Sequence, residues 1–197
     1  MFKGKKILIT GGTGSLGTAL TRRLLSLDVE QIRIFSRNEF KQISMESELN
    51  DDRLRFLIGD IRDADRVGRA IEDIDIVFHT AALKHVPIVE LHPCEGVLTN
   101  VSGSKIVADL CASNNVDAMV FISTDKAVDP TNFMGASKRA AEIYIQNLDK
   151  ENSITNFVTV RFGNVLGSSG SAIPLFLEQI RQGGPVTVTH PEVIRYF

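Results

Sequence analysis

Three adjacent side chains that can exchange protons or pair as ions follow a short apolar segment in the second half of the chain. Thr124, Asp125 and Lys126 place a hydroxyl, a carboxylate and an amine side by side, directly after the segment 118–123. A carboxylate and an amine can act as acid and base in one reaction if the carboxylate is protonated and the amine neutral for part of the cycle. Adjacent opposite charges normally form an ion pair, which favours the reverse states. The pattern therefore predicts an acid–base site whose protonation a bound substrate shifts by excluding water.

A second amine, that of Lys138, lies four residues after Met134. The segment 130–132 precedes a helix predicted over 133–149, and side chains at i and i+4 share one face of a helix. A lysine in that position can reach a nicotinamide ribose, and its charge lowers the pKa of a neighbouring hydroxyl. A solvated helix lysine would account for the same residue, so the residue types alone leave both interpretations open.

A glycine-rich turn near the N-terminus indicates which cofactor such a site would use. The apolar segment 5–10 runs into Gly11, Gly14 and Gly17, and an amphipathic pattern follows. Glycines at this spacing let the backbone turn tightly against a pyrophosphate, whose charge is favoured at the N-terminus of the next helix. A plain turn is the alternative, but the strand before the glycines and the helix after them favour dinucleotide binding. The predicted phosphate loop also includes Thr13, Ser15 and Leu16.

The residues Ser36, Arg37 and Asn38 end the second predicted strand, where dinucleotide-binding folds select the ribose. An acidic residue there would bind the 2′-hydroxyl of NAD, whereas this chain offers a hydroxyl, a guanidinium and an amide. These groups suit a 2′-phosphate, with Arg37 as its charge partner. We therefore expect NADP rather than NAD, although nearby Glu39 weakens the preference and a merely solvated Arg37 is the alternative.

Two later loops are predicted to contact the same cofactor. Asp60 could accept a hydrogen bond from the adenine amine, and Ile61 could cover the adenine ring. After the next predicted strand, the small residues Ala81 and Ala82 would let the backbone approach the phosphates and ribose.

Apolar strands alternate with helical segments along the whole chain. Strands are predicted at 5–10, 31–36, 53–58, 75–79, 118–123 and 156–162, and the longest helices at 94–114 and 133–149. Because each of the first five strands is followed by a helix, the pattern predicts an α/β fold, a doubly wound parallel sheet with helices on both faces. Such folds bind ligands at the carboxyl ends of their strands, which is where Asp125 and Lys126 lie.

Composition narrows the partners and the compartment. The 197 residues carry a net charge of −2, which gives no general attraction to nucleic acid or to an acidic membrane face. No apolar run approaches the roughly 20 residues of a membrane span. Cys94 and Cys111 lack metal or disulfide spacing and are expected to be small buried residues of a reducing cytoplasm. His79, His85 and His92 have no matching carboxylates, so we expect no metal site.

Several of these motifs together resemble the extended short-chain dehydrogenase/reductase family of nucleotide-sugar enzymes. The motifs are the glycine-rich start, Ala81-Ala82, Asn100, Ser123-Thr124-Asp125-Lys126, Lys138 and Arg161-Phe162-Gly163-Asn164-Val165. The Asp-Lys pair and the segment 130–139 are further similar to bacterial polysaccharide-biosynthesis dehydratases that act on UDP-N-acetylglucosamine to make capsule, O-antigen and flagellin glycans. The resemblance covers nearly the whole chain and implies a Rossmann-like fold.

The resemblance implies a lyase, an NADP-dependent UDP-N-acetylglucosamine 4,6-dehydratase. Hydride would leave C4 of the sugar and return to C6, Lys126 would take the C5 proton, and Asp125 would protonate the departing 6-hydroxyl. The product would be a UDP-4-keto-6-deoxy-hexosamine, with or without inversion at C5.

Met134 departs from the wider family, whose catalytic tyrosine lies four residues before the lysine. A thioether cannot exchange a titrating proton. Some capsule and O-antigen dehydratases resemble this chain in having methionine there, so activity is still expected. Lys138, Thr124 and a bound water are the candidates for removing the proton of the sugar hydroxyl.

The resemblance also implies binding residues and a division of the chain. Cofactor contacts are implied for Lys84, Asn100, Ser123 and Lys138, and substrate contacts for Lys84, Asn164, Pro174 and Arg195. An NADP-binding domain is expected over 1–163 and the beginning of a nucleotide-sugar domain over 164–197, apparently truncated because family members continue well beyond Phe197. We expect a homo-oligomer in the cytoplasm, or the cytoplasmic part of a longer membrane-anchored protein.

Two alternatives stay open. A UDP-sugar 4-epimerase forms the same ketone without eliminating the C6 oxygen, although epimerases usually keep the tyrosine and lack the Asp-Lys pair. A noncatalytic NADP-binding module would bind the cofactor without exchanging hydride with any UDP-sugar.

Overall fold

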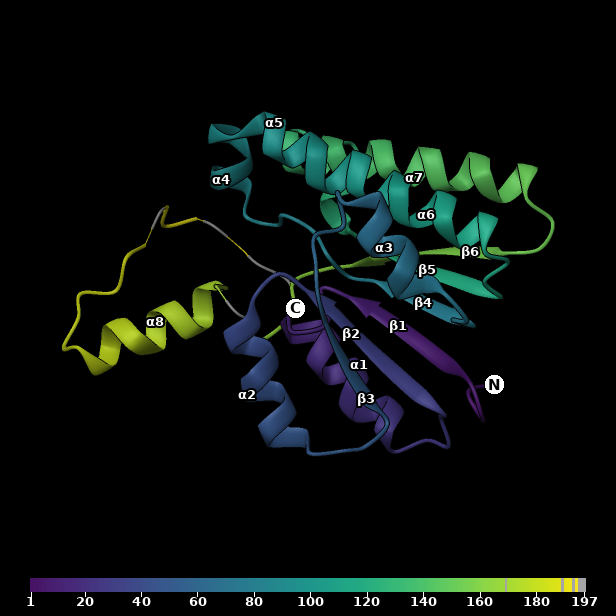
Figure 1. Cartoon of the computed structure of the whole chain (residues 1–197). Helices are drawn as coiled ribbons and strands as arrows, with labels where there is room; N and C mark the ends of the chain where they lie inside the picture. Colours follow the sequence, from purple (N-terminus) through teal and green to yellow (C-terminus); the bar gives the residue numbers. More distant parts are fainter. Residues whose placement is uncertain (169, 189, 193, 195–197) are drawn as a thin grey trace. The chain divides into compact units, whose positions relative to one another are not determined.

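The computed structural model describes residues 1–168, 170–188, 190–192 and 194 of the chain (Figure 1). The chain forms two compact units, Met1–Arg161 and Phe162–Phe197. This boundary lies two residues before the one expected from the sequence. The roles expected for the two units stay predictions.

A six-stranded sheet organises the first unit. Its strands lie in the order β3-β2-β1-β4-β5-β6, and β1 pairs in parallel with both β2 and β4. The chain thus starts in the middle, moves outward to one edge, returns, and moves outward to the other, which confirms the predicted doubly wound fold. The strands are β1 Lys6–Thr10, β2 Gln31–Ser36, β3 Leu54–Ile58, β4 Ile76–His79, β5 Ala118–Thr124 and β6 Asn156–Phe162.

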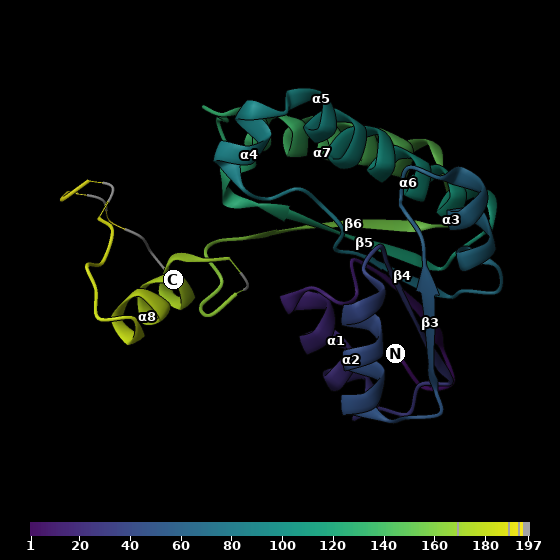
Figure 2. The same cartoon turned by 60° about the vertical axis from the view of Figure 1, so that its left-hand side comes forward.

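Helices cover both faces of this sheet (Figures 1 and 2). α1 and α2 lie on one face, and α3, α6 and α7 lie on the other. The longer helices are α1 Ser15–Leu25, α2 Glu39–Leu49, α3 Ala64–Ile71, α6 Ser104–Ser113 and α7 Phe133–Glu151. Shorter turns are α4 Val86–Leu91, α5 Pro93–Gly96, the π-helix η1 Val97–Gly103 and the 3-10 helix η2 Asp125–Ala127.

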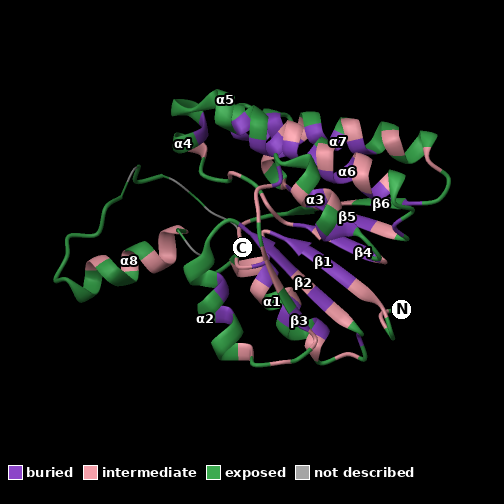
Figure 3. Cartoon of the chain, viewed as in Figure 1, coloured by how far each residue is buried: buried purple, intermediate pink, exposed green. Residues whose placement is uncertain are grey.

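The central strand β1 explains why its sequence is an unbroken apolar run. Ile7, Leu8 and Ile9 all have an exposed fraction of 0 %. Leu8 belongs to the core cluster that includes residues of α3 and α6, whereas Ile7 and Ile9 belong to the cluster on the α1 and α2 side. Figure 3 shows the strands at the middle of the sheet as buried. Each such side chain contributes about 1.5–3 kcal/mol by leaving water, so the sheet centre is the most stable place from which to hold a site.

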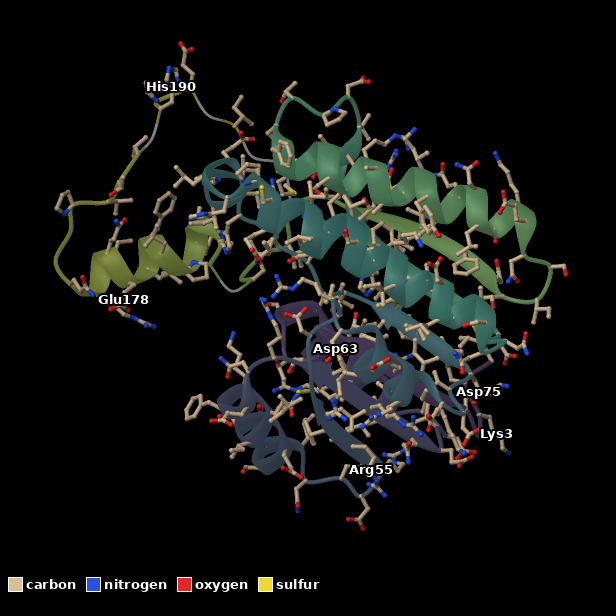
Figure 4. The ribbon with its side chains drawn as sticks, turned by 45° about the horizontal axis from the view of Figure 1, so that its top comes forward. Lys3, Arg55, Asp63, Asp75, Glu178 and His190 are labelled. Carbon is tan, nitrogen blue, oxygen red and sulfur yellow. The ribbon has the colours of Figure 1, made fainter. Side chains whose placement is uncertain are left out.

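Most long helices of the first unit begin at a side-chain cap. Asn38, Asp63 and Asn132 each accept a hydrogen bond from the N–H three residues along, at 2.8 to 3.0 Å, and start α2, α3 and α7. Figure 4 shows Asp63 in this place. α1 differs, because Gly14 precedes it and supplies no side-chain cap.

The long helix predicted over 94–114 is confirmed in outline but is interrupted by the π-helix η1. α5, η1 and α6 follow one another without a break from Pro93 to Ser113. A π-turn inserts an extra residue without changing the apolar composition, so hydrophobic spacing does not reveal it. Its consequence is that the buried Asn100 is presented to the loop after β4, where its amide bonds to Leu83.

The two cysteines differ in their surroundings. Cys111 has an exposed fraction of 0 %, as predicted. The expectation that Cys94 is buried is wrong, since this residue is exposed. It lies on the outer side of α5, where it lines an open apolar cavity with Pro93, Val97, Leu98 and Phe133.

The second unit contains one described helix, α8 Ala172–Arg181, which has no buried residue. Across the described residues of both units, no helix is long and apolar enough to cross a membrane.

Two glycines in helices provide a matched test of the packing. A Cβ at Gly17 in α1 would lie 2.5 Å from the carbonyl oxygen of Gly12, whereas at Gly68 in α3 the nearest atom would be 4.0 Å away. We expect Gly17→Ala to lower the free energy of unfolding by about 1–3 kcal/mol, because the helix must move off the loop. Gly68→Ala is expected to raise it by about 0.5–1 kcal/mol, because alanine restricts the unfolded chain. Urea denaturation of both variants measures the difference, and equal effects would contradict the packing argument.

Candidate functional site

Two loops meet where β1 and β4 end. The strands are paired so that Thr10 lies opposite His79. The next residue, Gly11, has a φ of +65°, and a Cβ there would lie 2.7 Å from the backbone nitrogen of Ala81. Only glycine meets both conditions. The structure therefore brings together two of the residues expected to approach the cofactor phosphates.

The N-terminus of α1 has the properties of an anion site. It has no acidic residue in its first turn, whereas α2 carries Glu39 and α3 carries Asp65 there. The first N–H groups of a helix have no intrahelical partner and carry partial positive charge. With the glycines before them, these groups fit the pyrophosphate of a dinucleotide.

The buried His79 connects the ends of β1 and β4 to α6. His79 Nδ1 lies 2.7 Å from the hydroxyl of Thr10, and its Nε2 lies 3.0 Å from the hydroxyl of Ser104. Burial, assisted by the charge of Lys138, lowers the pKa of His79 to about 3, so the ring is neutral. His79 thus has a packing role, and the described residues contain no group of three side chains able to hold a metal ion.

Two of the three residues expected to bind the cofactor ribose already make hydrogen bonds within the protein. The buried Ser36 hydroxyl accepts a hydrogen bond from Gln42 at 3.0 Å, and Asn38 caps α2. The side chain of Arg37 is 60 % exposed, and its guanidinium lies 3.8 Å from the carboxylate of Asp60. Of the three residues, Arg37 is therefore the one whose side chain is open to an incoming phosphate.

The side chains of Asp60 and Ile61 are less accessible than expected for residues that contact an adenine ring. Partial burial opposes ionisation of Asp60, but hydrogen bonds from Arg62 outweigh it and lower the pKa of the carboxyl. Arg62 holds both oxygens of Asp60 at 2.8 to 3.1 Å. Ile61 is 5 % exposed, and its side chain would contact a Cβ placed at Gly103. Their part in adenine binding stays a prediction.

Asn100 holds the loop after β4 at both of its polar atoms. Its amide oxygen accepts the N–H of Leu83 at 2.8 Å, and its nitrogen donates to the carbonyl of Leu83 at 3.0 Å. The same nitrogen donates to the hydroxyl of Ser137 on α7, also at 3.0 Å. Asn100 thus joins the loop that carries Ala82 and the exposed Lys84 to the helix that carries Lys138.

Thr124, Asp125 and Lys126 form one hydrogen-bonded group at the end of β5. The Thr124 hydroxyl donates to Asp125 Oδ1 at 2.8 Å, and Lys126 Nζ donates to the same oxygen at 3.0 Å. Partial burial favours protonated Asp125, but these two hydrogen bonds outweigh it and lower the pKa of the carboxyl. The ion pair expected from adjacent opposite charges therefore forms, with half of the Asp125 side chain exposed.

A glycine sets the distance between this group and α7. A Cβ at Gly135 would lie 2.1 Å from the carbonyl oxygen of Lys126. The first turn of α7 therefore packs directly on η2. This contact places Met134 and Lys138 near Asp125 and Lys126 by backbone packing.

Lys138 lies inside the protein. It is 4 % exposed, and its Nζ lies 4.0 Å from the centroid of the Phe121 ring. Burial lowers the pKa of Lys138 to about 7, although the charge of Glu142 acts in the opposite direction. Met134 is 3 % exposed. The alternative of a solvated lysine is thus wrong, while the catalytic role of Lys138 stays a prediction.

A fully buried carboxylate lies one turn further along α7. Glu142 has an exposed fraction of 0 % and accepts hydrogen bonds from Arg161 at 2.9 and 2.6 Å and from Arg139 at 3.0 Å. Burial opposes its ionisation, but the hydrogen bonds from Arg161 and Arg139 outweigh this and lower the pKa of Glu142 to about 2.

The sequence analysis missed Glu142, Phe121 and Gly135. An acidic residue four positions after Lys138 was a signal for Glu142, because i and i+4 side chains adjoin on a helix. No local pattern marks Phe121 or Gly135, whose importance comes from contacts between β5, η2 and α7.

The remaining predicted residues belong to the second unit. Asn164 and Pro174 are partly buried within it. Arg195 lies outside the described residues. Their expected role in substrate binding stays a prediction.

Comparison with known proteins gives consistent matches over almost the whole chain. Residues 7–197 match the protein family described as polysaccharide biosynthesis protein. The X-ray structure of Pen from Bacillus thuringiensis is 45 % identical, with a TM-score of 0.93 over 96 % of this chain and 61 % of that one.

Two curated relatives carry different activity names. The UDP-N-acetylglucosamine 4,6-dehydratase (inverting) of Campylobacter jejuni is 45 % identical over 96 % of this chain and 58 % of its own length. A UDP-glucose 4-epimerase of Rickettsia bellii is 44 % identical over 100 % of this chain and 59 % of its own. The chain thus spans about three fifths of the length of either relative.

The burial of Lys138 predicts a specific dependence of stability on pH. Between the pKa of about 7 in the folded protein and the usual 10.5, the unfolded chain binds this proton and the folded chain does not. The free energy of unfolding should therefore rise with pH in this interval, by roughly 1.4 kcal/mol per pH unit from this group. Replacement by methionine should remove that rise in urea denaturation measured across the interval. Lys150→Met, at an exposed lysine of the same helix, is the control, and parallel curves for all three proteins would contradict the assignment.

Proposed function

Since this chain belongs to the polysaccharide biosynthesis protein family, we propose that it is the cofactor-binding part of an NADP-dependent UDP-N-acetylglucosamine 4,6-dehydratase. The observation that carries the proposal is the hydrogen-bonded group of Thr124, Asp125 and Lys126 at the carboxyl end of β5. It would supply an acid and a base at the carboxyl edge of the sheet, to which the loops after β1 and β4 also belong. The name of the Campylobacter jejuni relative supports the same activity.

The cofactor would be held by groups that fit it. The Gly11 and Ala81 contact and the N-terminus of α1 suit the pyrophosphate, and Arg37 suits a 2′-phosphate. Bound NADP would supply hydride chemistry, taking a hydride from C4 of the sugar and returning it to C6.

The acid–base group would perform the elimination. A ketone at C4 acidifies the C5 proton, which Lys126 would take. Asp125 would give a proton to the C6 hydroxyl as it leaves as water, and Lys126 would return its proton to C5 when hydride reaches C6. Because Asp125 and Lys126 form an ion pair, the sugar must enter between them or exclude water around them before either can act.

Removal of the C4 hydroxyl proton needs a different group from Met134, whose thioether cannot accept it. Thr124 already donates to Asp125, so a proton taken from the sugar by the Thr124 oxygen could pass to that carboxylate as Thr124 releases its own. This route would also protonate Asp125 for its later role as acid. Lys138 and a bound water are the other candidates.

The second unit would begin the sugar-nucleotide site. We assign Asn164, Pro174 and Arg195 to the UDP part of the substrate, and Lys84 to both cofactor and substrate. This assignment follows the resemblance of the segments that carry these residues.

A 4-epimerase is the second candidate, because the Rickettsia bellii relative bears that name. An epimerase would use the same ketone but would return hydride to C4. Its product would have the mass of the substrate, whereas a dehydratase product is lighter by one water.

The elimination can be tested with the intact protein, UDP-N-acetylglucosamine and mass spectrometry of the product. We expect loss of water, and we expect Asp125→Asn and Lys126→Met each to lower kcat about 100- to 10,000-fold, because each removes one proton-transfer group. Asp52→Asn, an exposed charge change outside the site, is the control. Unchanged turnover in both site variants would refute the roles of Asp125 and Lys126, and an isomer of unchanged mass would favour the epimerase.

The choice of cofactor can be tested separately by isothermal titration with NADP⁺ and NAD⁺. Replacing Arg37 with methionine should raise the Kd for NADP⁺ about 10- to 100-fold, because a charged hydrogen bond to the 2′-phosphate is lost. The Kd for NAD⁺ should stay nearly the same. Arg55→Met, at an exposed arginine on β3, controls for general charge. Equal losses for both cofactors would remove Arg37 from the 2′-phosphate site.

A further inference from the structure

Within the part of the chain that the structure describes, the amine of Lys138 is buried without a carboxylate in direct contact. It is 4 % exposed, and no carboxylate of the described residues lies within ion-pair distance of its Nζ. A buried charged amine without a partner is strongly disfavoured. The groups that do surround it should therefore decide whether it carries its charge.

The Phe121 ring is the nearest of these groups. Lys138 Nζ lies 4.0 Å from its centroid, within the distance at which the negative face of an aromatic ring attracts a cation. Phe121 is fully buried on β5, and the neutral His79 ring stacks on it at 5.7 Å between centroids. His79 keeps the ring in place through its hydrogen bonds to Thr10 and Ser104.

Glu142 is the second group. It lies four residues after Lys138, on the same face of α7. Its carboxylate is fully buried and is held by Arg161 and Arg139, which keep it ionised. Its charge favours the protonated form of Lys138.

We propose that Phe121 and Glu142 are positioning residues that act through Lys138, holding its buried amine in place and increasing the fraction of it that is protonated. Their importance for turnover rests on the proposed function, in which Lys138 adjoins the cofactor ribose. In this chain Met134 supplies no phenol that could share the charge of Lys138. The ring and the carboxylate do so instead.

The other charged groups on the elements around Lys138 are occupied elsewhere. They pair with one another or with the backbone: Asp125 with Lys126 in η2, Glu90 of α4 with the N–H of Phe133, Glu95 of α5 with Arg62, and Asp109 of α6 with Lys105. Phe121 and Glu142 are thus the groups to change.

The charge of Lys138 can be titrated directly by NMR. The intact protein is labelled with [ε-13C]lysine, and the Lys138 signal is identified by its loss in Lys138→Met. We expect Phe121→Leu to lower the midpoint by roughly 1 pH unit, because the attraction of the ring is lost. Glu142→Gln should lower it by roughly 1 pH unit or more, because the negative charge is lost. A midpoint that stays or rises in either variant overturns the role of that residue.

Two control variants and one further variant complete the test. Met119→Leu changes another fully buried residue of β5, and Asp149→Asn removes another carboxylate of α7, so neither should move the midpoint. Glu142→Asp keeps the negative charge on a side chain one methylene group shorter, so it should leave the midpoint within roughly half a pH unit of the unaltered protein, even if Glu142→Gln fails to fold. A fall of roughly 1 pH unit or more in Glu142→Asp would overturn the role of the Glu142 charge. Because no step of the titration needs substrate, a protein that titrates as expected but forms no product would refute the proposed function alone.

Discussion

The backbone contact between Gly11 and Ala81 is the constraint on which the candidate site depends. β1 and β4 are adjacent parallel strands in register, so the loops that follow them leave the sheet at the same height. They can do so only because residue 11 lacks a Cβ. The hydrogen bonds that the His79 ring shares with the hydroxyls of Thr10 and Ser104 then join the ends of β1 and β4 to α6. Backbone atoms, rather than side chains, therefore shape the candidate pyrophosphate site.

The two amines of the site carry their charge in different ways. Lys126 is partly exposed and pairs with Asp125, whose side chain is also partly exposed. A ligand bound there would exclude water from this ion pair. Lys138 is buried, with burial and the charge of Glu142 acting in opposite directions on its pKa. Lys126 is thus accessible to a substrate, whereas Lys138 is enclosed by the protein.

The sequence was sufficient for the sheet, for its strand bounds to within one residue and for the glycine-rich loop after β1, because apolar periodicity and glycine spacing are local properties. The contact of Gly11 with Ala81 did not follow from it. The family followed from motifs spread along the chain. The π-helix, the exposed Cys94 and the surroundings of Lys138 did not follow. The distance from Lys138 to Phe121 depends on how α7 packs on β5, and that packing depends on Gly135 meeting the carbonyl of Lys126. Contacts between elements distant in sequence leave no local pattern to detect.

Met134 stands where the wider family has a tyrosine, and this difference affects more than the proton acceptor at that position. A phenol next to Lys138 would share its charge, and each group would alter the pKa of the other. With a thioether there, Phe121 and Glu142 are the groups that favour the charge of Lys138. Under the proposed function, proton exchange with the sugar falls to the neighbouring group on β5 and η2, where Thr124, Asp125 and Lys126 already share hydrogen bonds. Met134 and the Asp-Lys pair would then be two parts of one arrangement, with the acid–base groups at the end of β5 rather than on α7.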